Sequence, residues 1–280
     1  MTNTWCIAKK EFQDLSNSPM VLVILIGYAV MLLINILSIY DSLAYIDFSN
    51  TYYDNFGLYF GDNLFSTLSS SYGPIVGIII GCVSIASERH NHALNTLLVK
   101  PVYRDTIING KLLGMLMFLL LVIGFSILLY TSALFVLCGD VFASALMDYL
   151  CRLPAVFLFS LIVLAIYLSW AILLSLLIKN QAFAMIIGSI LVYIAYLVPT
   201  MNFALVVSNL FPGKEQIVYN LLVSVTPGNY FPGVRSNLFN SSNSIFSSLQ
   251  LILPDMAQFL LYSIVAIVLS YIIFIRGDEA

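Results

Sequence analysis

The chain consists of long apolar runs separated by short polar segments. A bilayer core about 30 Å thick requires about 20 apolar helical residues, because each residue rises about 1.5 Å along an α-helix. Six runs reach that length, and none contains Asp, Glu, Lys, Arg or His; they cover residues 20–40, 68–86, 112–138, 153–178, 182–206 and 256–275. Their apolar character is continuous and does not alternate with period two, which favours helices over a membrane barrel. The pattern predicts an all-α polytopic membrane protein, with residues 1–280 forming one transmembrane domain.

The composition supports this fold class. Only 9% of the residues are charged, whereas soluble domains carry about 25%. Most of the surface must therefore face lipid. The net charge of −3 gives no basic footprint, so we expect no nucleic acid partner. Four cysteines are too few for a disulfide scaffold.

The basic residues orient the chain, because Lys and Arg are retained on the cytoplasmic side during membrane insertion. If the N-terminus is cytoplasmic, eight of the 11 Lys and Arg residues fall in cytoplasmic segments; the other three are Arg152, Lys214 and Arg235. We expect a multi-pass protein of the cell membrane with both termini in the cytoplasm and without a cleavable signal.

The first residues predict an amphipathic helix over 3–15. Its apolar stripe consists of Trp5, Ala8, Phe12 and Leu15, while Lys10, Glu11 and Asp14 fall opposite and Ile7 lies off the stripe. Such a helix is expected to lie in the cytoplasmic interface against membrane lipid. The alternative is an ordinary juxtamembrane flank.

The longest cytoplasmic loop, residues 87–111, contains a short leucine-faced helix. Leu94, Leu97 and Leu98 repeat at helical spacing, and Pro101 ends the helix because it has no N–H to donate. This face has to be buried, either against the ends of the protein's own helices or against a cytoplasmic partner.

Small residues recur every fourth position in the second run, at Gly73, Gly77 and Gly81. Without side chains on that face, another helix can approach closely. The neighbouring helix can belong to the same chain or to a second copy.

The outer segment 207–255 contains three Pro-Gly pairs, which divide it into pieces too short to span a membrane. We expect its apolar piece, 217–225, to form a helix that enters the outer leaflet only partway. A passive surface loop is the alternative.

These features together resemble type 2 ABC transporter permeases. The resemblance is carried by Glu88-Arg89, by Leu94 to Leu98, by Pro101 with Arg104, and by Gly110-Lys111 at the start of the third run. The amphipathic N-terminal helix is similar to the elbow helix of that family. The chain departs from the family at His92-Ala93, where Gly-Thr is usual.

The resemblance implies a permease that docks on a separate ABC ATPase subunit, which would bind the ATP and Mg. The coupling residues would be Glu88, Leu94, Leu97, Leu98, Pro101 and Arg104, and the elbow would be anchored by Trp5, Phe12 and Leu15. It also implies a dimer with a second permease copy or a related chain, and short outer helices that close the pathway. We expect export of a lipid-like, amphipathic or other small substrate.

No ATP-binding, protease or hydrolase motif occurs in the sequence, so we expect no enzyme activity in this chain. His90 and His92 have too few ligands nearby for zinc, and we expect no metal site. An ion-coupled transporter usually carries ionisable groups in its spans, and these runs have none. An ATP-independent channel or secondary transporter, a non-transporting scaffold, and a permease for copper-enzyme maturation remain alternatives.

Other residues leave two interpretations open. Cys138 and Cys151 flank the second outer loop and could form a disulfide in an oxidising exterior. Asn35, Asn202 and Gln258 could line a pathway, but hydrogen bonds between neighbouring helices are the favoured interpretation.

Overall fold

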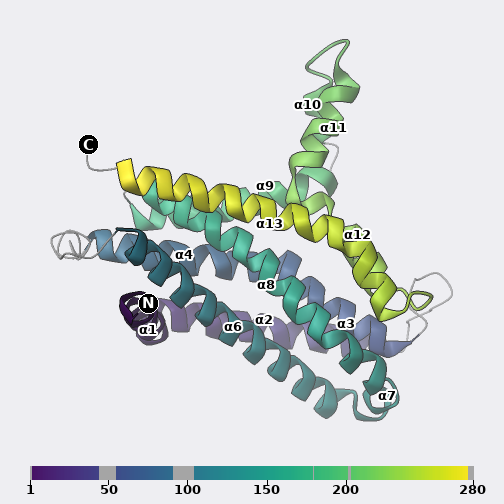
Figure 1. The fold of residues 1–280 in the computed structure, drawn as a ribbon. Coiled ribbons are helices and arrows are strands. Elements are labelled where there is room, and N and C mark those ends of the chain that lie inside the picture. Colours follow the sequence, from purple (N-terminus) through teal and green to yellow (C-terminus); the bar gives the residue numbers. More distant parts are fainter. Residues whose placement is uncertain (1, 44–54, 91–103, 179, 201–202, 277–280) are drawn as a thin grey trace.

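The computed structural model describes residues 2–43, 55–90, 104–178, 180–200 and 203–276. Within these ranges the chain is helical and has no strand, and its long helices run side by side as a bundle (Figure 1). The predicted fold class, an all-α polytopic membrane protein, is confirmed.

Six long helices correspond to the six apolar runs: α2 (Pro19–Ser42), α4 (Gly73–His90), α6 (Arg104–Leu137), α8 (Leu146–Leu177), α9 (Gln181–Thr200) and α13 (Ile245–Arg276). In the part of the chain that the structure describes, five helical stretches are long and apolar enough to cross a membrane. The fifth run, expected over 182–206, differs, because α9 ends at Thr200 and a separate α10 (Phe203–Ser208) follows.

The second span begins earlier than its apolar run. Helix α3 (Phe56–Ser66) continues through a π-helical turn, η3 (Thr67–Ser71), toward α4, and the stretch 56–85 is mostly buried. Asp62 lies inside this stretch with 1% of its surface exposed. The sequence places this carboxylate in an outer loop, because a charge normally ends an apolar run.

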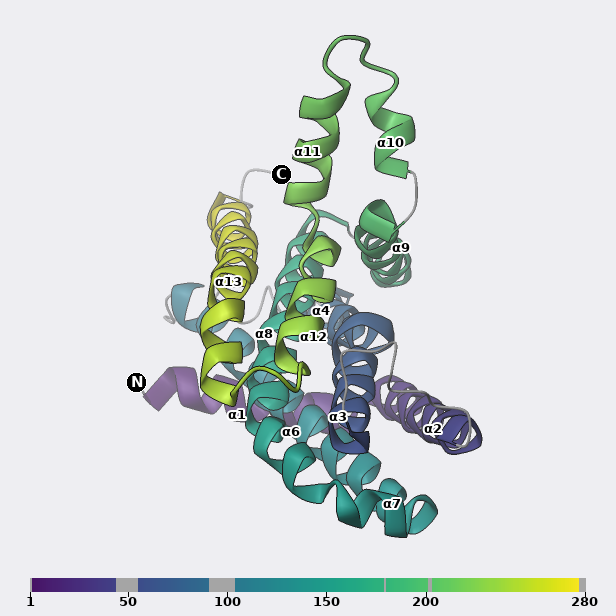
Figure 2. The ribbon, with the colours of Figure 1, turned by 90° about the vertical axis from the view of Figure 1, so that its right-hand side faces the viewer.

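Helix α8 occupies the centre of the bundle and packs against α4 on one side and α13 on another (Figure 2). Two buried serine pairs join α8 to its neighbours, one pair to η3 and the other to α13. The hydroxyls of Ser69 and Ser160 lie 3.1 Å apart, and those of Ser169 and Ser263 lie 2.9 Å apart. In an apolar interior such pairs satisfy polar groups that would otherwise be costly to bury.

The outer segment forms α10, α11 (Glu215–Val225), a short 3₁₀ turn η4 (Pro227–Asn229) and α12 (Phe231–Leu238). Helices α10 and α11 make a hairpin that projects away from the bundle (Figure 2). Gly213, at the hairpin tip, has φ of 83°, a conformation that L residues with side chains rarely adopt. Helix α12 instead lies against the bundle, beside α13 and α3.

Candidate functional site: the base of the loop between α4 and α6

Helices α4 and α6 meet the loop at one end of the bundle, the end where both chain termini lie (Figure 1). Helix α4 ends at His90 and α6 begins at Arg104. Glu88 and Arg104, two predicted coupling residues, therefore lie in the last turn of α4 and at the first position of α6. The other four, Leu94, Leu97, Leu98 and Pro101, lie outside the described residues.

The N-terminal helix α1 (Thr2–Asn17) lies across this end of the bundle and packs on α6 (Figure 2). Ala8 and Leu15 are buried, and the ring of Phe12 meets that of Phe118 edge-on at 5.9 Å between centroids. Trp5 is 55% exposed. The indole is exposed, and its contact with membrane lipid stays a prediction.

Two glycines on α6 allow α1 to approach closely. A Cβ atom at Gly110 would lie 2.7 Å from the Ile7 Cβ, and one at Gly114 would lie 2.7 Å from the Ala8 carbonyl oxygen. Both positions therefore require glycine while α1 is docked. The spacing of four residues between small side chains is the sequence signal that could have revealed this contact.

The buried face of α1 differs from the predicted stripe. Ile7, expected off the stripe, contacts Gly110, and Glu11, expected on the polar face, is 5% exposed. The assignment of Glu11 to the polar face was wrong, because its charge is matched by a lysine 100 residues away in sequence.

That lysine, Lys111, connects three helices. Its Nζ donates to Glu11 Oε2 on α1 at 2.7 Å and to the Ser84 carbonyl oxygen on α4 at 3.3 Å, while Lys111 itself belongs to α6. The side chains of Lys111 and Glu11 are only 8% and 6% exposed. Burying two charges is tolerated when they pair closely and find further hydrogen bonds, and breaking such a pair costs about 3–5 kcal/mol.

The glycine face of α4 packs within the chain. A Cβ at Gly77 would lie 3.3 Å from the Leu164 carbonyl oxygen, and one at Gly81 would lie 2.5 Å from the Ala171 Cβ, both on α8. At Gly73, where η3 passes into α4, a Cβ would collide with the Leu68 carbonyl. Of the two neighbours left open by the sequence, the structure places a helix of the same chain against this face.

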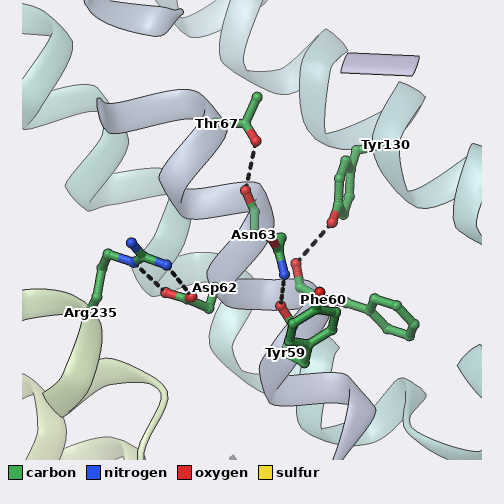
Figure 3. Close-up of polar contacts among 7 residues, drawn as sticks. All are labelled: Tyr59, Phe60, Asp62, Asn63, Thr67, Tyr130 and Arg235. Carbon is green, nitrogen blue, oxygen red and sulfur yellow. Dashed lines mark hydrogen bonds and ion pairs between the residues drawn. The ribbon is translucent and has the colours of Figure 1, made fainter. Parts of the chain in front are cut away.

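A second group of polar contacts surrounds Asp62 on α3 (Figure 3), and α3 lies at the end of the bundle away from the chain termini (Figure 1). Arg235 on α12 bonds this carboxylate at two points, Nε to Oδ1 at 2.8 Å and Nη2 to Oδ2 at 2.5 Å. On another side of α3, the hydroxyl of Tyr130 donates to the Phe60 carbonyl at 3.2 Å. Helix α3 is thereby tied to both α12 and α6.

The C-terminal end of α12, which carries Arg235 in its last turn, is also held by Arg152 of α8. The Arg152 guanidinium donates to the Leu238 carbonyl and, at 3.3 Å each, to the carbonyls of Asn240 and Asn243. The last carbonyls of a helix lack intrahelical donors, so a cation there caps the helix and opposes its dipole. In the sequence, Arg152 and Arg235 were notable only because they fall in segments expected on the outer side of the membrane, where basic residues are few.

Of the other polar candidates, Gln258 has a structural role. Gln258 and Tyr262 on α13 both donate to the Ser224 carbonyl, at 3.4 and 3.1 Å, and so attach the end of α11 to the bundle. Asn202 lies outside the described residues. Cys138 and Cys151 are both free thiols and form no disulfide.

An apolar groove of about 410 Å³ lies between α8, α9 and α13. Its walls include Trp170 on α8, Leu191 on α9, and Tyr262 with Leu269 on α13. Pockets of about 300–1,000 Å³ with apolar walls and few polar groups are typical of small-molecule sites.

The described helices form a polytopic membrane bundle with a crosswise N-terminal helix. The family model described as ABC-2 family transporter protein matches residues 5–278. The chain belongs to this family and is a membrane permease subunit of an ABC transporter, which implies an ATPase partner. No curated protein sequence matches the chain.

Proposed function

We propose that this chain is the permease of an ATP-driven exporter and that a separate ATPase grips the loop between α4 and α6. The observation that carries the proposal is the clamp by Lys111, which joins α4, α6 and α1 immediately above that loop. A loop whose two helices are held together can pass a movement of its partner into the membrane as a rigid body. Leu94, Leu97 and Leu98 would enter the ATPase, with Glu88, Pro101 and Arg104 setting the ends of the loop.

We propose a dimeric permease, with two identical or related chains and two ATPases. Leu210, at the hairpin tip, is 71% exposed and Ile217 on α11 is 64% exposed. Apolar surface of this kind marks contacts with other proteins or with lipid, and this supports a second chain in the assembly. Both termini would be cytoplasmic and the assembly would lie in the cell membrane.

The proposed substrate is lipid-like or amphipathic. The groove between α8, α9 and α13 supports this class, because its walls are almost wholly hydrocarbon and because α8 and α13 are long and apolar enough to cross a membrane. A single hydroxyl, that of Tyr262, lies on the wall and also bonds the end of α11.

Purification from the native membrane in mild detergent tests the proposal. We expect an ATPase subunit with a phosphate-binding loop to co-purify, and the complex in lipid vesicles to hydrolyse ATP and move a fluorescent phospholipid analogue between leaflets. Movement of that probe by the purified chain alone, without ATP or a partner, would indicate an ATP-independent transporter and overturn the proposal. A stable complex that hydrolyses ATP and moves no probe would reject the lipid-like substrate.

A further inference from the structure

Lys111 lies close to the loop between α4 and α6 and bonds both α4 and α1. Ser84 lies six residues before His90, the last described residue of α4, and Lys111 lies seven residues after Arg104, the first described residue of α6. The bond from Lys111 to the Ser84 carbonyl thus joins the two helices close to the segment that connects them. Helices joined in this way cannot slide past one another without losing the bond.

The same lysine also holds α1. Glu11 is one of the residues of α1 that face α6, and its carboxylate lies 2.7 Å from the Lys111 ammonium. Close contacts of Gly110 and Gly114 with α1 flank this pair on α6. Any displacement of the lower part of α6 therefore carries α1 with it, or else separates two buried charges.

A helix that only anchored the chain in the membrane interface would not require a buried ion pair to α6. Lys10 and Asp14 form an ion pair on the same helix at 4.0 Å, with side chains 63% and 59% exposed. Pairs of that exposed kind contribute about 0–1 kcal/mol. The chain thus places one lysine pair on an exposed surface, where its loss matters little, and another where it links three helices.

We infer that Glu11 and Lys111 are positioning residues that transmit movement of the ATPase-bound loop to α1, so that the elbow moves during each ATP cycle and is not a static anchor. The inference rests on the proposed ATPase coupling. It assigns the two residues no contact with ATP or substrate.

A native thiol allows a direct test. Cys6 on α1 and Cys151 are exposed, whereas Cys82 and Cys138 are buried. With Cys151 replaced by Ser, a fluorophore on Cys6 of the full permease–ATPase complex reports the surroundings of α1. We expect a non-hydrolysable ATP analogue to shift the fluorescence of the otherwise wild-type complex.

The decisive variant is Glu11→Met/Lys111→Met, which replaces both charges by apolar chains of similar length. Such replacements often preserve folding, whereas Lys111→Met alone strands a buried carboxylate. We expect the double variant to bind the ATPase and to lose the fluorescence shift. Lys10→Met is the matched control and should keep the shift, and Lys111→Arg should restore it, because a guanidinium can bond both Glu11 and the Ser84 carbonyl.

The outcomes separate the two proposals. A normal shift in the folded double variant would overturn the inference and leave the ATPase coupling intact. No shift in the otherwise wild-type complex, despite bound and active ATPase, would also overturn it. Failure of the wild-type chain to bind any ATPase would refute the proposed function and the inference with it.

Discussion

Arg235 on α12 and Asp62 on α3 are 173 residues apart in sequence and form a bidentate ion pair in the structure (Figure 3). The carboxylate side chain is 1% exposed, while the arginine side chain is 33% exposed. The pair fastens the short helix before the last span to the broken helix of the second span. It therefore controls how firmly the outer segment is held on the bundle.

Replacing Arg235 by Met should destabilise the protein more than replacing Asp62 by Asn. The first change removes two hydrogen bonds and the opposite charge from a carboxylate that is 1% exposed, and it is expected to cost about 3 kcal/mol, the lower end for a broken buried pair. The second leaves an arginine that still reaches the surface. Thermal unfolding of the two variants and of the double variant in detergent measures the difference. Equal losses in both single variants would contradict this view of the pair.

Arg152 should control the order of the segment that follows α12. Arg152→Met removes the donors for the carbonyls of Leu238, Asn240 and Asn243, so we expect faster proteolytic cleavage there. Arg152→Lys should give an intermediate rate, since an ammonium lacks the planar fork of a guanidinium. Identical cleavage of all three proteins would show that Arg152 does not hold this segment.

Gly81 should tolerate no side chain. Gly81→Ala places a Cβ 2.5 Å from that of Ala171, and overpacking of this kind costs about 1–3 kcal/mol. The added change Ala171→Gly should recover part of the loss by removing the opposing methyl group. The unfolding temperature in detergent measures both effects.

Gly124 on α6 supplies the control for Gly81. No atom lies within 4 Å of its hypothetical Cβ, so Gly124→Ala should be neutral or should stabilise the helix by about 1 kcal/mol. If Gly81→Ala behaved in the same way, the close contact between α4 and α8 would not exist in the membrane.

Hydropathy predicted the helical class and the neighbourhood of each span, because lipid imposes the same requirement on every crossing helix. It missed the start of the second span, since Asp62 interrupts the apolar run and its partner is remote in sequence. It likewise placed Glu11 on the wrong face of α1. Helical periodicity shows which side chains share a face of one helix. Whether a charged side chain on that face is buried depends on the ionic or hydrogen-bonding partner that another helix supplies.

For the glycines of α4, the sequence predicted a close contact correctly but did not identify the partner helix. The spacing of Gly73, Gly77 and Gly81 indicated a close helix contact, but not the helix that makes it. The choice of α8 depends on the route of the whole chain through the bundle, which no local spacing encodes. Gly110 and Gly114 have the same spacing, but the sequence did not show that α1 packs against them.

Quantitative co-purification of the ATPase tests whether that subunit grips the leucine face of the loop between α4 and α6. Leu97→Glu or Leu98→Glu places a charge on that face, and Thr96→Glu places the same charge on the opposite face of the expected helix. We expect the two leucine variants to reach the membrane folded and to lose the ATPase, while the Thr96 variant retains it. Retention of the ATPase and of its activity by all three variants would show that the leucine face is not where the ATPase binds.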